Sequence, residues 1–186
     1  MLRAGSMDLF KREILNRLKT IAGMLSVAVC LASFPSFSQS DLSEYDELAS
    51  GANNIARVNQ DGSDNSLNLN QSGVDNQSRT FQNGFTNTIN IDQQGSQHYV
   101  LASQFGANVE AEILQVGVGN VVLSAQQGEN LLLDVMQTGT GNVALIQQSG
   151  YENSIGIQQY GSGNAVGVLQ WGNSQHVEIT QKCCSD

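Results

Sequence analysis

Residues 71–95 read QSGVDNQSRTFQNGFTNTINIDQQG. Three times in this stretch a Gln is followed two residues later by a Gly, and successive glutamines are eleven residues apart. Catalytic and metal sites depend on carboxylates, imidazoles and thiols, so a neutral amide at a fixed interval indicates a structural repeat.

The spacing continues along the chain without insertion or deletion and defines twelve units between about Ala49 and Gln181. Each unit reads Gln-x-Gly-x-x-Asn-x-h-x-h-x-Gln, where h is usually apolar. The repeated glutamines are Gln60, Gln71, Gln82, Gln93, Gln104, Gln115, Gln126, Gln137, Gln148, Gln159, Gln170 and Gln181. The repeated glycines are Gly51, Gly62, Gly73, Gly84, Gly95, Gly106, Gly117, Gly128, Gly139, Gly150, Gly161 and Gly172.

Within each unit the apolar residues alternate with polar ones. Leu67 and Leu69 stand between Asn65 and Gln71, and the pattern recurs at Ile89 and Ile91. Strict alternation over about six residues is typical of a half-buried strand. We expect the Gly to form the turn between strands, because it tolerates a positive φ.

A meander of hairpins would leave the apolar face of these strands uncovered. A solenoid with two strands per coil covers it, because two parallel sheets then pack face to face with a period of 22 residues. The sequence therefore predicts an all-β protein, a β-solenoid of about six 22-residue rungs. We expect sheets about 10 Å apart and rungs about 4.8 Å apart.

The inward residues support two facing walls of different bulk. The first sheet carries Ala56 and Val58, Ser78 and Thr80, Val100 and Ala102, Val122 and Ser124, Ala144 and Ile146, and Val166 and Val168. The second carries Leu67 and Leu69, Ile89 and Ile91, Ala111 and Ile113, Leu133 and Val135, Ile155 and Ile157, and Val177 and Ile179. A slim wall against a bulky wall keeps the gap constant and well filled.

Buried amides need partners, since an unpaired buried polar group costs about 1–3 kcal/mol. Amides stacked one rung apart can bond to one another, so we predict Gln and Asn ladders on both sheets. The predicted Asn members are Asn54, Asn65, Asn76, Asn87, Asn120, Asn142, Asn153 and Asn164. His98, Val109, Leu131 and Gln175 interrupt these columns, so we expect looser geometry in the middle rungs.

The ladders satisfy every amide except those at the ends. The chain has no Pro after Pro35, and the repeat stops at Gln181, so we expect no cap on the terminal rungs. An open rung presents unpaired backbone and amide groups, on which another chain of the same period could add strands.

Residues 1–38 have the layout of a secretory signal peptide, with basic residues before an apolar run from Ile21 to Ala32 and small residues after it. The run is about twelve residues, shorter than the roughly 20 of a membrane span, so we predict export, cleavage after Ser38 and no transmembrane span in the mature chain. We further predict an acidic segment at 39–50, the repeat at 51–181 and a tail at 182–186.

The mature chain would keep three basic and fifteen acidic residues, a net charge of −12. Such a charge argues against nucleic acid or anionic membrane as a partner. Cys183 and Cys184 are neighbours in sequence and cannot staple a fold; they are read as part of a dispensable tail, with intermolecular pairing as the alternative.

No catalytic or metal-binding constellation stands out, and we expect no cofactor. The two histidines, His98 and His176, lie far apart in sequence; His98 occupies an Asn slot and His176 an outward position. The acidic residues at turn positions are interpreted as solubilising charge: Asp61, Asp64, Asp75 and Glu129. We therefore predict a protein that is not an enzyme.

The repeat resembles the curlin repeat of the bacterial extracellular amyloid called curli. The acidic segment Asp41–Ser50, with its Leu and Tyr residues, is similar to the leader of the minor, nucleating subunit, and Asn rather than Ser opens most strands. The resemblance implies a secreted protein that nucleates curli fibres at the cell surface. It implies the major curlin, an outer-membrane secretion pore and accessory assembly factors as partners. The nucleator's terminal repeat is usually basic, whereas here only Lys182 follows Gln181.

Two alternatives stay open. The chain could be the major fibre-forming subunit, although that subunit would carry a Gly- and Asn-rich stretch where the acidic segment stands. It could be a monomeric solenoid adhesin, which would be expected to end in a capping element. An ice-binding solenoid is disfavoured, because the outward residues contain no Thr-x-Thr row.

Overall fold

The computed structural model describes residues 53–183. The predicted signal peptide, the acidic segment, Gly51 and Cys184 lie outside the described residues. The described part contains ten strands and no helix. Their bounds are β1 Ile55–Ser63, β2 Ser66–Val74, β3 Gln77–Phe85, β4 Thr88–Ser96, β5 Tyr99–Val118, β6 Val121–Thr140, β7 Val143–Tyr151, β8 Ser154–Ser162, β9 Ala165–Asn173 and β10 His176–Cys183.

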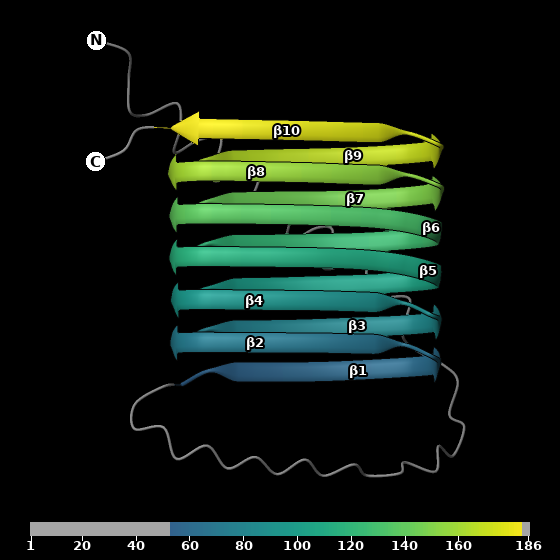
Figure 1. Ribbon diagram of the computed structural model, residues 1–186, viewed down its shortest axis with the longest axis horizontal. Coiled ribbons are helices and arrows are strands. Elements are labelled where there is room, and N and C mark those ends of the chain that lie inside the picture. The colour runs from purple at the N-terminus through teal and green to yellow at the C-terminus, as the bar shows by residue number, and fades with distance from the viewer. Residues whose placement is uncertain (1–52, 184–186) are drawn as a thin grey trace, which may run out of the picture. The chain divides into compact units, whose positions relative to one another are not determined.

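The strands wind into a parallel coil with the predicted period. Ile55 of β1 pairs with Gln77 of β3, and Ser66 of β2 pairs with Thr88 of β4, so each partner lies 22 residues further along the chain. The same offset holds in the other strand pairs. Figure 1 shows the strands stacked in chain order from β1 to β10. The predicted all-β solenoid of about six rungs is confirmed.

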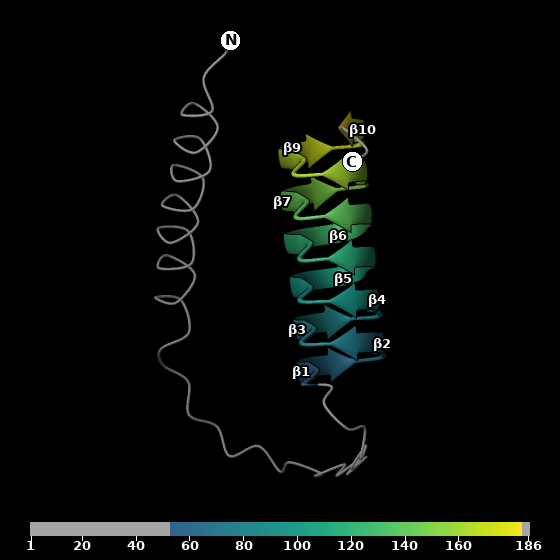
Figure 2. The same ribbon diagram turned by 90° about the vertical axis from the view of Figure 1, so that its left-hand side faces the viewer.

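Two sheets form the sides of the coil. The first sheet contains β1, β3, β7, β9 and the N-terminal halves of β5 and β6, and the second contains β2, β4, β8, β10 and the C-terminal halves. Figure 2 shows the two columns of strands side by side. The sheets are joined into one hydrogen-bonded ladder, because β5 and β6 each run through a corner and belong to both.

That continuity depends on two residues. At most other corners the backbone N–H of the residue in the Asn column donates to an Asn side chain of the preceding rung, as Asn76 N donates to Asn54 Oδ1 at 3.0 Å; Asn120 N donates to His98 Nδ1 instead. Val109 and Leu131 have no side-chain amide. At this corner the backbones of Val109 and Leu131 pair directly with each other. The strand therefore continues around the corner.

The core lies between the sheets and consists of the predicted inward residues. Ile89, Ile113, Leu133, Ile155 and Ile157 are buried from the second sheet and pack against smaller residues of the first. At the N-terminal rung, by contrast, Val58 is 50% exposed, whereas Val100 two rungs further along is fully buried. Three inward hydroxyls of the first sheet are buried without a hydrogen-bond partner, and these belong to Ser78, Thr80 and Ser124.

Stacking of the rungs, as well as backbone conformation, requires Gly in the turns. Gly106 has φ 136°, and a Cβ built on it would lie 1.7 Å from the carbonyl oxygen of Gly128 in the next rung. Real Cβ atoms do not approach backbone oxygen so closely, so a side chain here would push two rungs apart. Gly84 and Gly95 are constrained in the same way, each at 1.9 Å.

The last strand extends slightly beyond the repeat. Lys182 and Cys183, which the sequence placed in the predicted tail, still pair with Tyr160 and Gly161 as part of β10. Their backbones continue the ladder because the rung below offers a matching strand. Within residues 53–183 no helix is long and apolar enough to cross a membrane.

Candidate functional site

The repeated glutamines form two columns of side-chain hydrogen bonds, one in each sheet. In every pair the Nε2 of one Gln donates to the Oε1 of the Gln one rung later, as Gln82 does to Gln104 at 3.0 Å and Gln93 to Gln115 at 2.9 Å. The distances across both columns run from 2.6 to 3.2 Å. All bonds run in one direction, from donor in the earlier rung to acceptor in the later one.

The second N–H of each amide ties the two sheets together. Gln82 in the first sheet also donates to the backbone oxygen of Ser66 in the second, at 3.1 Å, and Gln104 donates to Thr88 at 3.0 Å. Both N–H groups and the oxygen of an interior Gln are thus paired while the residue is fully buried. A carboxylate could not serve here, because it has no N–H to donate.

The asparagines are placed inward as predicted, but their interactions differ from the predicted ladder. The Nδ2 of Asn76 donates to the backbone oxygens of Ser72 and of Gly95, at 3.3 and 3.2 Å, while its Oδ1 accepts from the backbone N of His98 at 3.1 Å. Asn is one methylene shorter than Gln and follows the turn directly, so turn backbone groups lie within its reach. The Asn side chain therefore binds backbone groups near the corners of the coil rather than the side chain of the next Asn.

A direct bond between two column asparagines occurs in the described residues only at the C-terminal end. There Asn164 Nδ2 donates to Asn142 Oδ1 at 3.0 Å. The predicted Asn ladder is therefore wrong as a side-chain column and is replaced by side-chain bonds to the backbone. The members that make such bonds are Asn54, Asn65, Asn76, Asn87, Asn120, Asn142, Asn153 and Asn164.

The expected loosening of the middle rungs does not occur. His98 is buried in its Asn slot, where Nδ1 accepts from the backbone N of Asn120 at 3.3 Å and Nε2 lies 3.1 Å from the backbone oxygen of Gln94. Burial lowers the pKa of His98. Val109 and Leu131 are buried and replace the Asn contacts with apolar packing and a direct backbone ladder. Gln175 makes the usual backbone contact of this column, because its backbone N donates to Asn153 Oδ1.

The two ends of the coil carry complementary groups. Within residues 53–183 no side chain donates to the Oε1 of Gln60 or Gln71, which are the first members of the columns. The last members, Gln170 and Gln181, each use one N–H on a backbone oxygen, and within residues 53–183 the other N–H has no Gln partner. In this described part of the chain, the first rung thus offers amide acceptors and the last rung offers amide donors.

The predicted turn glycines from Gly62 to Gly172 have φ between 95° and 146° and lie within the strands, close to the corners of the coil, rather than between them. The sequence reasoning missed a second positive-φ position, two residues after each Gly. It is occupied by Asp64, Asp75, Asn108 and Asn130, for example, and by Gly at 119, 141 and 163. Asn, Asp and Gly tolerate the left-handed region best, and their frequency at this position is the signal that could have revealed it.

The remaining polar residues do not form a catalytic or metal centre. In the described part of the chain no three His, Cys, Asp or Glu side chains lie together in a way that could hold a metal ion. His176 is exposed on the outer side of the second sheet, with its Nδ1 2.6 Å from the Ser154 hydroxyl. Asp61, Asp64 and Glu129 are exposed in turns.

Residues 86–117, 128–161 and 150–182 each match the family model of the curlin associated repeat. These segments of the chain are similar to the curlin repeat. They begin and end within the solenoid and contain members of the Gln columns and turn glycines described above. The matched family is a structural one. No curated protein and no solved structure matches the chain.

Proposed function

We propose that this protein is a secreted amyloid subunit that nucleates curli fibres at the bacterial cell surface, with a role in adhesion and the biofilm matrix. The observation that supports this proposal is that the two ends of the described coil are complementary. Gln60 and Gln71 offer amide acceptors, and Gln170 and Gln181 offer amide donors without a Gln partner. A chain of the same period placed on either end continues both Gln columns with correct polarity.

The end rungs also have apolar surface to bury. Val58 points inward in β1 but is 50% exposed, because within residues 53–183 no rung covers it on one side, whereas Ala102 in the same column is buried. Adding a rung buries Val58 at roughly 25 cal/mol for each Å² of apolar surface. Backbone groups of the terminal strands gain partners at the same time, so strand addition is favoured by three terms acting together.

The partners proposed for this activity are the major curlin subunit and further copies of the chain itself. Export would use an outer-membrane secretion pore and accessory assembly factors. Nucleation rather than fibre formation is favoured by the acidic segment Asp41–Ser50, which resembles the leader of the minor subunit. A major fibre subunit with unusual flanking segments is the alternative, and a monomeric adhesin is a third.

A seeding experiment distinguishes these functions. Purified major curlin is allowed to polymerise with and without a small molar fraction of this protein, and fibre formation is followed over time. A nucleator removes the lag phase; a monomeric adhesin leaves it unchanged, which would contradict the proposal. A major subunit would instead form abundant fibres on its own after its own lag.

A variant links seeding to the Gln columns. Replacing Gln60, Gln82 and Gln104 together with Leu should leave a compact chain that no longer shortens the lag, because the N-terminal half of the first sheet's Gln column is lost. The matched control removes three outward amides from the second sheet, with Asn68, Asn90 and Gln158 replaced by Leu. Equal seeding by the two variants would count against the ladder as the template.

A further inference from the structure

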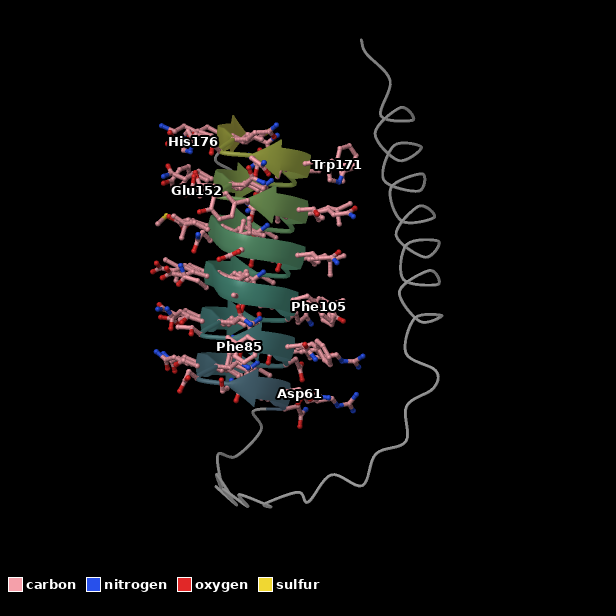
Figure 3. The ribbon with its side chains drawn as sticks, turned by 90° about the vertical axis from the view of Figure 1, so that its right-hand side faces the viewer. Asp61, Phe85, Phe105, Glu152, Trp171 and His176 are labelled. Atoms are coloured by element: carbon pink, nitrogen blue, oxygen red, sulfur yellow. The ribbon has the colours of Figure 1, made fainter. Side chains whose placement is uncertain are left out.

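The two outer faces of the solenoid differ in chemistry. The first sheet carries a continuous apolar surface across its three central rungs, formed by Tyr99, Leu101, Val121, Leu123, Val143 and Leu145, all partly exposed. We call this the apolar face. Register makes it continuous, since Leu101 pairs with Leu123 and Leu123 with Leu145. Phe105 and Trp171 extend it, and Figure 3 shows both on one side of the stack with His176 on the other.

The outer side of the second sheet is acidic. Its outward positions include Asp92, Glu110, Glu112, Asp134 and Glu178. The charged residues of the first-sheet strands are Arg57, Asp61 and Arg79, in or next to the N-terminal rung, and Glu129, which is exposed at the corner beyond the apolar face. The chain is strongly acidic, yet its carboxylates avoid the apolar face. A face free of repulsion between copies is what lateral pairing requires.

The whole outer side of the first sheet, with the apolar face at its centre, is large enough for a stable interface. Its six strands about 4.8 Å apart and seven residues of about 3.3 Å each span roughly 650 Å². Two copies pressed together would bury about 1,300 Å² in total, within the range of specific protein interfaces. Soluble monomers seldom expose an apolar patch larger than a few hundred Å².

We propose that the apolar face pairs with the same face of a second copy of this chain about a two-fold axis. Two flat faces with in-register columns of Leu and Val interdigitate as in a dry interface between stacked sheets. The partner is a second copy because a two-fold contact between identical faces needs only self-complementarity. The inference goes beyond the proposed function, since the pairing leaves both ends of each coil free for strand addition.

Charge fixes the relative direction of the two coils. An axis parallel to the coil would gather Arg57 and Arg79 of both copies at one end. An axis parallel to the strands keeps each residue's position along the strand, so Arg57 faces Gly167 of β9 and Arg79 faces Leu145 of β7 in the other copy. The arginines of the two copies then lie at opposite ends of the interface, whereas four clustered guanidiniums repel one another. The two coils therefore run in opposite directions, with Leu101 and Leu123 at the centre.

Sedimentation of the freshly dissolved full chain tests the pairing. The chain is expected to be dimeric at micromolar concentration. Leu123→Asp should weaken the dimer at least tenfold, because it places a carboxylate in the centre of the interface. The matched control is Leu132→Asp, which alters an outward Leu of the second sheet that is 45% exposed and should leave the dimer unchanged.

Three results would overturn the inference: a chain that stays monomeric at about 100 μM, equal dimerisation of Leu123→Asp and the parent chain, or loss of the dimer in Leu132→Asp. Amide hydrogen exchange of the Gln columns establishes that each variant keeps the coil, and Leu145→Ser provides a milder change at the same face. Because dimerisation is measured without major curlin, a failure of the seeding test leaves this measurement intact, and the reverse also holds.

Discussion

Gly106 and Gly167 both lie in strands of the first sheet, but they differ in what surrounds them. A Cβ on Gly106 would meet the carbonyl oxygen of Gly128 at 1.7 Å, whereas a Cβ on Gly167 has nothing within 4 Å. Gly106 also has φ 136°, and Gly167 is not a positive-φ glycine. Sequence places Gly106 in the repeat, but only the neighbouring rung explains why no other residue fits.

Substitution of the two glycines should therefore have opposite consequences. Gly106→Ala is expected to lower the free energy of unfolding by more than about 3 kcal/mol, because it combines backbone strain with displacement of a rung. Gly167→Ala should be neutral or slightly stabilising, since it restricts the unfolded chain. Denaturant unfolding of the soluble chain measures both, and similar losses in the two variants would contradict the stacking explanation.

The hydroxyl of Thr80 is buried without a partner between the sheets. Thr80→Val replaces it with a methyl group of similar shape, so the free energy of unfolding should rise by about 1 kcal/mol. Thr80→Ser retains the hydroxyl, removes a methyl group and should instead destabilise the chain. A loss of stability in Thr80→Val would show that the hydroxyl has a partner.

His98 should make stability depend on pH. Burial lowers the pKa of His98 from the ordinary value of 6.5. Just below that pH, His98 is therefore protonated in the unfolded chain but still neutral in the folded chain. Stability is fully present above pH 6.5 and decreases on acidification, by at most about 1.4 kcal/mol per pH unit, until the folded pKa is reached. Denaturation midpoints measured from roughly pH 7.5 to 5.5, about one pH unit on either side of the usual His titration, should show the decrease in the parent chain.

His98→Asn restores the residue type of that column and should remove most of this dependence. The Asn can donate to turn carbonyls without titrating, as Asn76 does one rung earlier. An unchanged pH profile in His98→Asn would assign the dependence to other groups.

At the scale of the element, each Gln column is a chain of bonds with one direction. An interior member such as Gln115 accepts from Gln93, donates to Gln137 and donates to the backbone of Tyr99. The end member Gln181 accepts from Gln159 and donates to Ala165. Removal of an interior Gln leaves two buried glutamines without one of their hydrogen bonds, whereas removal of the end Gln takes one hydrogen bond from its single neighbour in the column.

Gln115→Leu is therefore expected to cost roughly 2–4 kcal/mol in the free energy of unfolding, because the donor of Gln93 and the acceptor of Gln137 lose their partners in the interior. Gln181→Leu should cost less than about 1 kcal/mol. Equilibrium unfolding of both variants provides the comparison. Equal costs would show that the column is not cooperative along the coil.

At the scale of the whole molecule, the polarity of the columns makes the two ends different. Donors at Gln170 and Gln181 match acceptors at Gln60 and Gln71, so copies are expected to join head to tail. Reversed joining would oppose acceptor to acceptor or donor to donor. The apolar face adds a lateral contact that is independent of the ends.

Gln170→Leu with Gln181→Leu should impair addition at the C-terminal end while leaving the N-terminal end competent. Single-fibre microscopy of labelled growth from variant seeds should then show one slow end, whereas parent seeds extend at both. Gln60→Leu with Gln71→Leu is the reciprocal control and should impair the other end. Loss of growth at both ends in either double variant would contradict the polarity.

The local pattern alone determined the 22-residue coil, the inward residues and the inward position of the glutamines, because alternation and period are properties of the chain. Tertiary structure decided that Asn76 binds turn backbone rather than another Asn, that Val109 and Leu131 let a strand pass a corner, and that the turn glycines are required by the next rung. It also decided that Leu101, Leu123 and Leu145 form one surface. These features depend on distances between residues 22 positions apart in the chain, and such distances exist only once the coil has closed.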